Sequence, residues 1–112
     1  MKGRALDLGC AVGRSSFELN QYFDEVVGVD ISKAFIACAD EYLKNKYQNC
    51  VGKVKFAVGD ACNLDKGLGK FNLIFGGNLI CRLYDPKAFL NHVKNFLEPN
   101  GILILASPCS WL

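Results

Sequence analysis

Short, mainly apolar segments alternate with amphipathic stretches along this chain, and the alternation limits its fold more than any other feature. The apolar segments are strand-sized and span 5–8, 25–29, 54–58, 71–75 and 102–106. Apolar strands separated by helices are typical of a parallel sheet that helices cover on both faces. We therefore predict an α/β fold with a doubly wound, mainly parallel sheet in which five strands are present.

Three helices are predicted between these strands, over 14–22, from Ser32 to about Lys46, and from Pro86 onward. Ser32 and Asp85 are suitable N-cap residues for the second and third helices, and Pro86 suits a first helical position. The apolar stripe of the third helix consists of Phe89, Leu90, Val93, Phe96 and Leu97. The segment 98–101, with sequence EPNG, is predicted to break that helix before the fifth strand.

Composition excludes several classes of protein. Apolar residues make up 51% of the 112 residues, which excludes a disordered chain and allows one domain. The 13 Lys and Arg residues nearly balance the 11 Asp and Glu residues, so no nucleic-acid partner is predicted. No apolar run approaches a membrane span and no signal-peptide pattern is present, so we predict no membrane partner and a cytoplasmic location.

The six cysteines do not form a metal-binding pattern. No two of them are spaced as Cys-x-x-Cys, and His92 is the single histidine, so no metal site is predicted. Because the cysteines are distributed over an alternating strand-and-helix pattern without a secretion signal, we predict reduced thiols.

Polar residues and glycines stand where the predicted strands end. The first strand leads into Asp7-Leu8-Gly9-Cys10-Ala11-Val12-Gly13, and Asp30, Asp60 and Asn78 follow the next three strands. In a sheet of this kind ligands bind outside the carboxyl ends of the strands. Asp30 lies about twenty residues after Gly9, a spacing suited to an acid that accepts both hydroxyls of a ribose. The arrangement predicts a ligand that contains a nucleoside.

The glycine pattern distinguishes between nucleoside ligands. A dinucleotide site would need glycines at positions 9, 11 and 14, whereas this chain has Gly9, Ala11 and Arg14. Asp7 would repel a pyrophosphate but could help to hold a cationic ammonium group. The ligand indicated carries a ribose, an adenine and an amino-acid tail, as S-adenosylmethionine does.

Residues 5–32, ALDLGCAVGRSSFELNQYFDEVVGVDIS, resemble the first two cofactor motifs of class I S-adenosylmethionine-dependent methyltransferases. The resemblance continues through VGDACNL (58–64), FNLIFGGNLICRL (71–83) and FLEPNGILILASP (96–108). It implies a Rossmann-like S-adenosylmethionine-binding methyltransferase domain over 1–112, with S-adenosylmethionine as cofactor. Such folds usually have seven strands, so we expect a domain that is incomplete at both ends and lacks the last two strands.

More narrowly, GCAVGRSSFEL, FDEVVGVDIS, GDACNL and SPCSWL are similar to the methyltransferase of ovothiol biosynthesis. That resemblance implies methylation of a small-molecule nitrogen, the imidazole of a thiohistidine. In that family the domain is often fused to an iron-dependent sulfoxide synthase, so a fused or upstream synthase domain is an expected partner. Cys81 and Cys109 depart from the family pattern on the substrate side.

The resemblance also implies roles for individual residues. Asp7, Gly9, Cys10, Ala11 and Gly13 are expected to line the methionine moiety, and Asp30 to hold the ribose hydroxyls. Ile31 and Ser32 would lie beside the adenine. Asp60 would accept a hydrogen bond from the adenine amino group, and Ala61 and Cys62 would lie against the ring. Asn78 would face the methyl-transfer centre.

No residue is assigned as a catalytic acid or base. His92 is interpreted as a surface or packing residue, and Asp85 as a helix cap in preference to a substrate contact. Tyr84 is a candidate substrate contact, and Trp111 is either a pocket wall or a docking anchor. Cys10 and Cys62 are interpreted as packing residues rather than redox groups.

The sequence thus predicts an enzyme that transfers a methyl group from S-adenosylmethionine to a small-molecule nitrogen. Two alternatives of other classes stay open at this point. One is a methyltransferase-like scaffold that binds cofactor or a partner without turnover, and the other is an NAD-binding oxidoreductase module.

Overall fold

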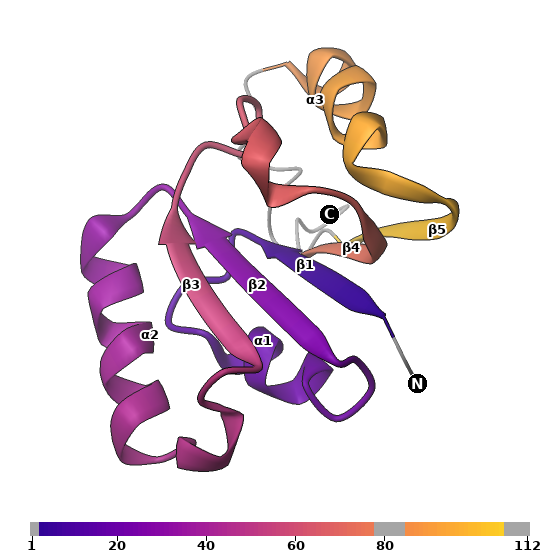
Figure 1. Cartoon of the computed structure of the whole chain (residues 1–112). Coiled ribbons are helices and arrows are strands. Elements are labelled where there is room, and N and C mark those ends of the chain that lie inside the picture. Colours follow the sequence, from indigo (N-terminus) through magenta and orange to yellow (C-terminus); the bar gives the residue numbers. More distant parts are fainter. Residues whose placement is uncertain (1–2, 78–84, 107–112) are drawn as a thin grey trace, which may run out of the picture.

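The computed structural model describes residues 3–77 and 85–106, which form one sheet of five parallel strands (Figure 1). The strands are β1 (Arg4–Leu8), β2 (Glu25–Asp30), β3 (Val54–Val58), β4 (Phe71–Gly77) and β5 (Leu97–Ala106). Their order across the sheet is β3-β2-β1-β4-β5. The predicted parallel α/β fold is confirmed.

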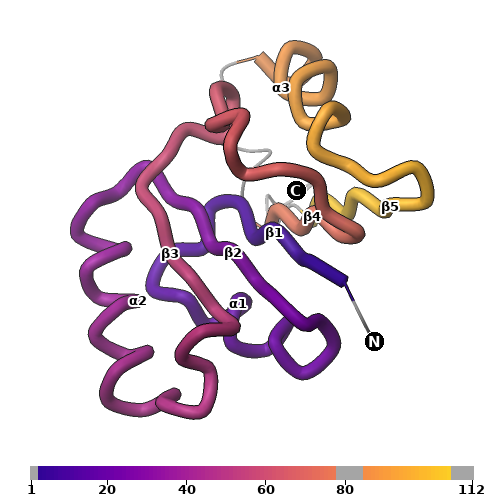
Figure 2. Tube along the Cα trace, viewed as in Figure 1, coloured from indigo at the N-terminus to yellow at the C-terminus, as the bar shows by residue number. Residues whose placement is uncertain are grey.

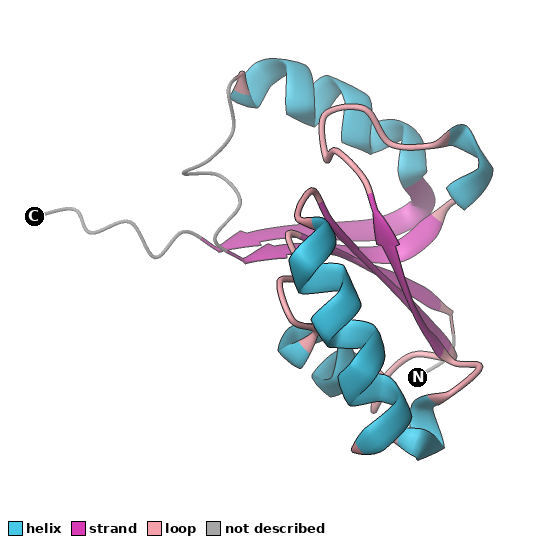
Figure 3. Ribbon diagram, turned by 90° about the vertical axis from the view of Figure 1, so that its left-hand side faces the viewer, coloured by secondary structure: helices cyan, strands magenta, loops and turns pink. Residues whose placement is uncertain are grey.

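Helices cover both faces of the sheet, as Figure 3 shows from the side. The helices are α1 (Arg14–Leu19), α2 (Lys33–Asn45) and α3 (Pro86–Val93), with the 3-10 turns η1 (Gln48–Cys50), η2 (Lys66–Leu68) and η4 (Lys94–Phe96). Each face has its own apolar core. One core joins Phe17 of α1 to Val26 and Val54, and the other joins Phe89 of α3 to Leu6. Successive strand residues point to opposite faces, which is why mainly apolar strands suit a sheet that helices cover on both faces.

The order of the strands fixes where the chain changes direction across the sheet. From β1 the chain passes outward to β2 and β3, and it then crosses to the other side of β1 to form β4 and β5 (Figure 2). The loop after β1 therefore lies at the point where the strand order reverses. In open α/β sheets ligands bind at such a point, at the carboxyl ends of the strands.

The predicted caps begin the two longer helices. The Ser32 hydroxyl accepts a hydrogen bond from the Phe35 backbone N–H at 3.1 Å. The Asp85 carboxylate accepts one from the Ala88 N–H, also at 3.1 Å, with Pro86 at the first helical position. The interpretation of Asp85 as a cap is confirmed.

The connection from α3 to β5 differs from its prediction. The helix ends at Val93, a 3-10 turn follows, and β5 already begins at Leu97, opposite Phe71. The next paired positions are Leu73 and Ile102, so the predicted breaker 98–101 is an irregularity within the strand. Leu90, assigned to the apolar stripe, is 42% exposed.

Strand β5 lies at one edge of the described sheet, and the apolar side chains on one of its faces have little cover. Ile102 is 60% exposed and Ile104 is 45% exposed. Ile102 pairs with Leu73, which belongs to the core beneath α1 and α2, but Ile102 itself is not among the residues of that core. Within the described sheet, β5 thus combines an unpaired edge with a poorly covered apolar face.

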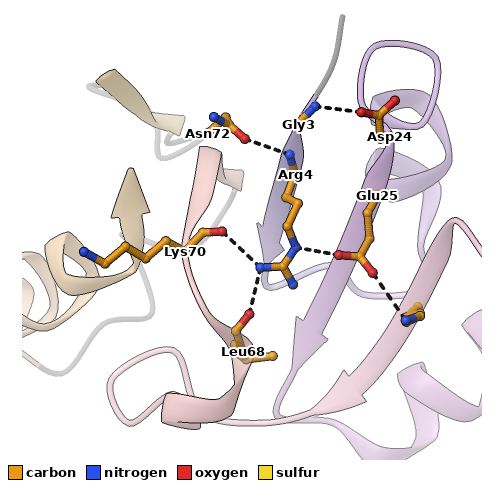
Figure 4. Close-up of polar contacts among 8 residues, drawn as sticks. Gly3, Arg4, Asp24, Glu25, Leu68, Lys70 and Asn72 are labelled. Carbon is orange, nitrogen blue, oxygen red and sulfur yellow. Dashed lines mark hydrogen bonds and ion pairs between the residues drawn. The ribbon is translucent and has the colours of Figure 1, made fainter. Parts of the chain in front are cut away.

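Arg4 links three parts of the fold near the amino ends of the strands (Figure 4). Its guanidinium donates to Glu25 on β2 and to the carbonyl oxygens of Leu68 and Lys70, at 2.9 and 3.0 Å, before β4. The guanidinium also lies 4.3 Å from the centre of the Phe71 ring. The Arg4 hydrogen bond, with Lys55 on the other carboxylate oxygen, holds the pKa of Glu25 below its usual range.

Among the described residues, no helix combines the length and the apolar character that crossing a bilayer requires. Cys10, Cys38, Cys50 and Cys62 are free thiols.

Gly28 lets α1 approach the middle of β2. A Cβ at Gly28 would lie 2.7 Å from the Ser16 Oγ and 2.7 Å from a ring carbon of Phe56. We expect Gly28→Ala to lower the free energy of unfolding by about 1–3 kcal/mol, because overpacking forces these side chains apart. Chemical denaturation measures the change. Gly67→Ala is the matched control, since a Cβ there would meet nothing closer than 3.5 Å. Equal effects of the two substitutions would contradict this account of α1 packing.

Candidate functional site

The loop after β1, residues 9–13, has an unusual backbone. Gly9, Ala11 and Gly13 have positive φ angles of 69°, 51° and 97°. Among the described residues, Ala11 is the one non-glycine with a positive φ, a conformation that costs free energy unless its surroundings impose it. Here the Ala11 N–H donates to the Asp30 carboxylate at 2.9 Å, which holds the residue in place.

Most backbone N–H groups of this loop already have partners inside the protein. Those of Gly9 and Cys10 donate to the Val29 carbonyl at 2.8 and 3.1 Å, and that of Gly13 donates to the Cys10 carbonyl at 2.9 Å. With Ala11 bound to Asp30, four of the five N–H groups of residues 9–13 are used. A phosphate-binding loop needs N–H groups that point at the ligand. The loop therefore lacks the donors of a dinucleotide site, in agreement with its glycine spacing.

Asp30 ends β2 and is held by two loops. Its Oδ2 accepts from the Ala11 N–H and its Oδ1 from the Ser32 N–H, both at 2.9 Å. The residue is 8% exposed. Each carboxylate oxygen has two lone-pair sites, so each can accept one more hydrogen bond. Two acceptors fixed side by side suit a pair of neighbouring hydroxyls, which is the role predicted for Asp30.

Asp7 differs from the expectation of a residue that lines the ligand directly. It is 1% exposed, and the Ser16 hydroxyl donates to its Oδ2 at 2.7 Å. Burial raises the pKa of Asp7 to about 7; the Ser16 hydrogen bond opposes this shift, and the neighbouring Asp30 adds to it. Asp7 thus lies beneath the loop and influences the site through its charge.

The other predicted contacts lie next to these groups. Ile31 is 72% exposed directly after Asp30, so an apolar side chain is available beside the proposed ribose acceptors. Gly59 donates to the Asp30 carbonyl at 3.0 Å, which brings the segment after β3 next to the end of β2. Asp60 there is exposed, and its Oδ1 accepts from the Cys62 N–H at 2.9 Å. Ala61 packs against the core that includes α3.

The thiols near the site are poor nucleophiles. Burial raises the pKa of Cys10 far above its ordinary value, and Asp7 and Asp30 add to this effect. Burial and the nearby Asp60 also raise the pKa of Cys62. Reactive cysteines have lowered pKa values, so the raised pKa values of both thiols agree with the predicted packing role.

His92 connects α3 to the loop that follows Asp60. Its Nε2 accepts a hydrogen bond from the Leu64 N–H at 2.8 Å, and its ring packs edge-on against Phe96 at 5.2 Å. These contacts agree with the predicted packing role. Among the described residues, no cluster of three or more His, Cys, Asp or Glu side chains could hold a metal ion.

Sequence reasoning misses two contributors to the site. The Ser16 hydroxyl donates a hydrogen bond to Asp7. In the sequence, the only indication of this contact is the position of Ser16 three residues after Gly13 on the predicted helix. The Val29 carbonyl fixes the start of the loop, and a backbone acceptor leaves no trace in a sequence. The predicted residues Asn78, Cys81, Tyr84, Cys109 and Trp111 lie outside the described residues.

Comparisons with known proteins point to one family. A family model described as "Methyltransferase domain" matches residues 2–112. Phosphoethanolamine N-methyltransferase 3 of Arabidopsis thaliana is 28% identical over 107 residues, which cover 95% of this chain. The match spans 21% of that relative, so the chain corresponds to about a fifth of its length.

Solved structures share the fold. The PH0226 protein of Pyrococcus horikoshii is 37% identical with a TM-score of 0.80, over 94% of this chain and 49% of that one. Phosphoethanolamine N-methyltransferase 1 of Haemonchus contortus, solved with phosphoethanolamine and S-adenosylhomocysteine, has a TM-score of 0.83 at 24% identity. That match covers 98% of this chain and 23% of the nematode enzyme.

The burial of Asp7 predicts a specific dependence of stability on pH. Its pKa is raised from 3.8 to about 7 by folding, so its contribution favours the folded state at low pH and is lost as pH rises through 7. Asp7→Asn keeps an acceptor for Ser16 without the charge. At pH 8 we expect the variant to be more stable by as much as about 4 kcal/mol, since each pKa unit corresponds to about 1.4 kcal/mol.

Denaturant unfolding of both proteins at pH 4 and pH 8 measures this difference. Ser16→Ala removes the hydrogen bond that favours ionised Asp7 and should lower stability at pH 8. An Asp7→Asn variant that is less stable than the wild type at pH 8 would show that the buried carboxylate stabilises the fold.

Proposed function

The chain belongs to the methyltransferase domain family, and on this basis we propose that it binds S-adenosylmethionine and transfers its methyl group to a nitrogen of a small molecule. The observation that carries the proposal is the doubly held carboxylate of Asp30 at the end of β2. The proposal concerns this chain, which spans about a fifth of its Arabidopsis relative.

The residues present fit the nucleoside part of the cofactor. Asp30 would accept the two ribose hydroxyls with the lone pairs that Ala11 and Ser32 leave unused. Exposed Ile31 would contact one face of the adenine. Asp60 would accept a hydrogen bond from the adenine amino group, and Ala61 and Cys62 would lie against the ring. These roles follow from the family resemblance, and the adjacency of β1, β2 and β3 supports them.

The charge of the site favours a cationic ligand. Asp7 and Asp30 lie close enough for Asp30 to raise the pKa of Asp7, and neither forms an ion pair with another described residue. A positively charged ligand would relieve their repulsion, whereas a pyrophosphate would increase it. With the loop N–H groups already used, this argues against the NAD-binding alternative.

S-adenosylmethionine supplies a methyl group on a sulfonium, which is already a good leaving group. The protein's contribution is then to align the acceptor and to exclude water, and no enzyme nucleophile is needed. The raised thiol pKa values of Cys10 and Cys62 agree with this division of roles. A neutral nitrogen acceptor can attack first and lose its proton afterwards, so a catalytic base is not required either.

The proposed acceptor is the imidazole of a thiohistidine, on the strength of the resemblance to the ovothiol methyltransferases. A cytoplasmic location and a fused or upstream sulfoxide synthase are part of the same proposal. The Arabidopsis relative is named for another nitrogen acceptor, phosphoethanolamine, which makes that amine the natural competitor in an assay.

We expect Asp30→Asn to weaken S-adenosylmethionine binding about a hundredfold, because charged hydrogen bonds to the ribose are lost. Titration calorimetry measures the affinity, and thermal unfolding reports whether the variant keeps its fold. Asp65→Asn is the matched control, since Asp65 also accepts a backbone N–H, that of Gly67 at 3.0 Å, in a turn away from the site. Equal affinities of wild type and Asp30→Asn would refute the proposed site.

Incubation of the protein with S-adenosylmethionine and either thiohistidine or phosphoethanolamine tests the acceptor. Mass spectrometry should show the gain of one methyl group on thiohistidine and none on phosphoethanolamine. Methylation of phosphoethanolamine alone would overturn the proposed acceptor. Cofactor binding without methylation of either compound would favour the scaffold alternative.

A further inference from the structure

A cavity lies on the α1 and α2 side of the sheet, and none of the residues assigned to the cofactor line it. Its volume is about 160 Å³. Residues from the end of the glycine loop, from α1 and from the carboxyl end of α2 line it: Val12, Arg14, Phe17, Tyr42, Lys46 and Tyr47. The proposed function leaves these residues unused.

Packed aromatic side chains form one side of this cavity. The rings of Phe17 and Tyr47 stack with their centres 3.9 Å apart and their planes 9° from parallel. Phe17 is buried and also meets Phe56 of β3 edge-on at 5.5 Å, so the stack is anchored to the sheet. Tyr42 forms another part of the lining, with the Lys46 ammonium 5.8 Å from its ring centre.

The cavity brings together two cations from distant parts of the chain. Arg14 begins α1, whereas Lys46 follows the end of α2. Neither forms an ion pair with any residue in the described part of the chain. Glu18, one helical turn after Arg14, is engaged with Gln21, whose side-chain amide donates to it at 3.1 Å. The cavity therefore contains two cationic side chains that no described carboxylate approaches within ion-pair distance.

We propose that this cavity binds a phosphate-sized oxyanion. A guanidinium, an ammonium and phenolic hydroxyls are all hydrogen-bond donors that suit phosphate oxygens, and Arg can contact two oxygens at once. The ligand is either free phosphate or the phosphate of a monoester whose body contacts the aromatic wall. The inference is independent of the cofactor site, because no residue is shared between them.

Titration of the ¹⁵N-labelled protein with inorganic phosphate at constant ionic strength tests the site. We expect saturable amide shifts concentrated in 14–17 and 42–47, outside the loop 9–13 assigned to the cofactor. Arg14→Gln and Lys46→Gln should each weaken binding about tenfold, because each removes a charge-assisted hydrogen bond. Both side chains belong to exposed residues, so the variants should keep the fold, which far-UV circular dichroism checks.

Lys44→Gln is the matched control, an exposed lysine in the last turn of α2 that does not line the cavity. An equal loss of affinity in Lys44→Gln, shifts that do not saturate, or acetate binding as tightly as phosphate would overturn the proposal. A parallel titration with phenyl phosphate separates the two sources of the anion. If phenyl phosphate binds more tightly than inorganic phosphate, the ligand is a monoester with an aromatic body. If the two bind equally, the ligand is free phosphate.

Discussion

The Asp30 carboxylate is the interaction on which the arrangement of the site depends. It ends β2, and it accepts the backbone N–H of Ala11 from the loop after β1 and that of Ser32 before α2. One buried side chain thus fixes the left-handed conformation of Ala11 and the start of α2 together. Both bonds come from the backbone of the protein itself, so the fold sets the geometry of the two acceptor oxygens.

The hydrogen bonds within the loop after β1 also limit which ligands the loop can bind. A glycine-rich loop at the start of a helix usually suggests phosphate binding, because its N–H groups are free to face an anion. Here four of the loop's N–H groups donate inside the protein. Those of Gly9 and Cys10 bind the Val29 carbonyl, that of Gly13 binds the Cys10 carbonyl, and that of Ala11 binds the Asp30 carboxylate. With the Asp30 carboxylate at the end of β2 and few free N–H groups, the site is acidic and poor in donors. A cationic nucleoside ligand is the partner that suits both properties.

The sequence predicts the fold well where local pattern and tertiary packing agree. The apolar run 54–58 predicts a strand, and β3 spans Val54–Val58. The prediction fails at 98–101, where pairing between Phe71 and Leu97 starts β5 ahead of the breaker residues. Leu90 has the spacing of a core residue but is 42% exposed, because periodicity shows which face a residue occupies and not whether a partner covers that face.

Individual roles in the site are less predictable than its location. The order of acids and glycines at strand ends identifies Asp30, whose hydrogen bonds then agree with an acceptor role. The burial of Asp7 and its bond to Ser16 depend on how closely α1 approaches β1, which no local pattern encodes. Amide chemical-shift mapping with S-adenosylmethionine tests whether the carboxyl ends of β1, β2 and β3 form the cofactor site. We expect saturable shifts concentrated in 9–13, 30–32 and 60–62, and saturable shifts confined to other residues would contradict this site.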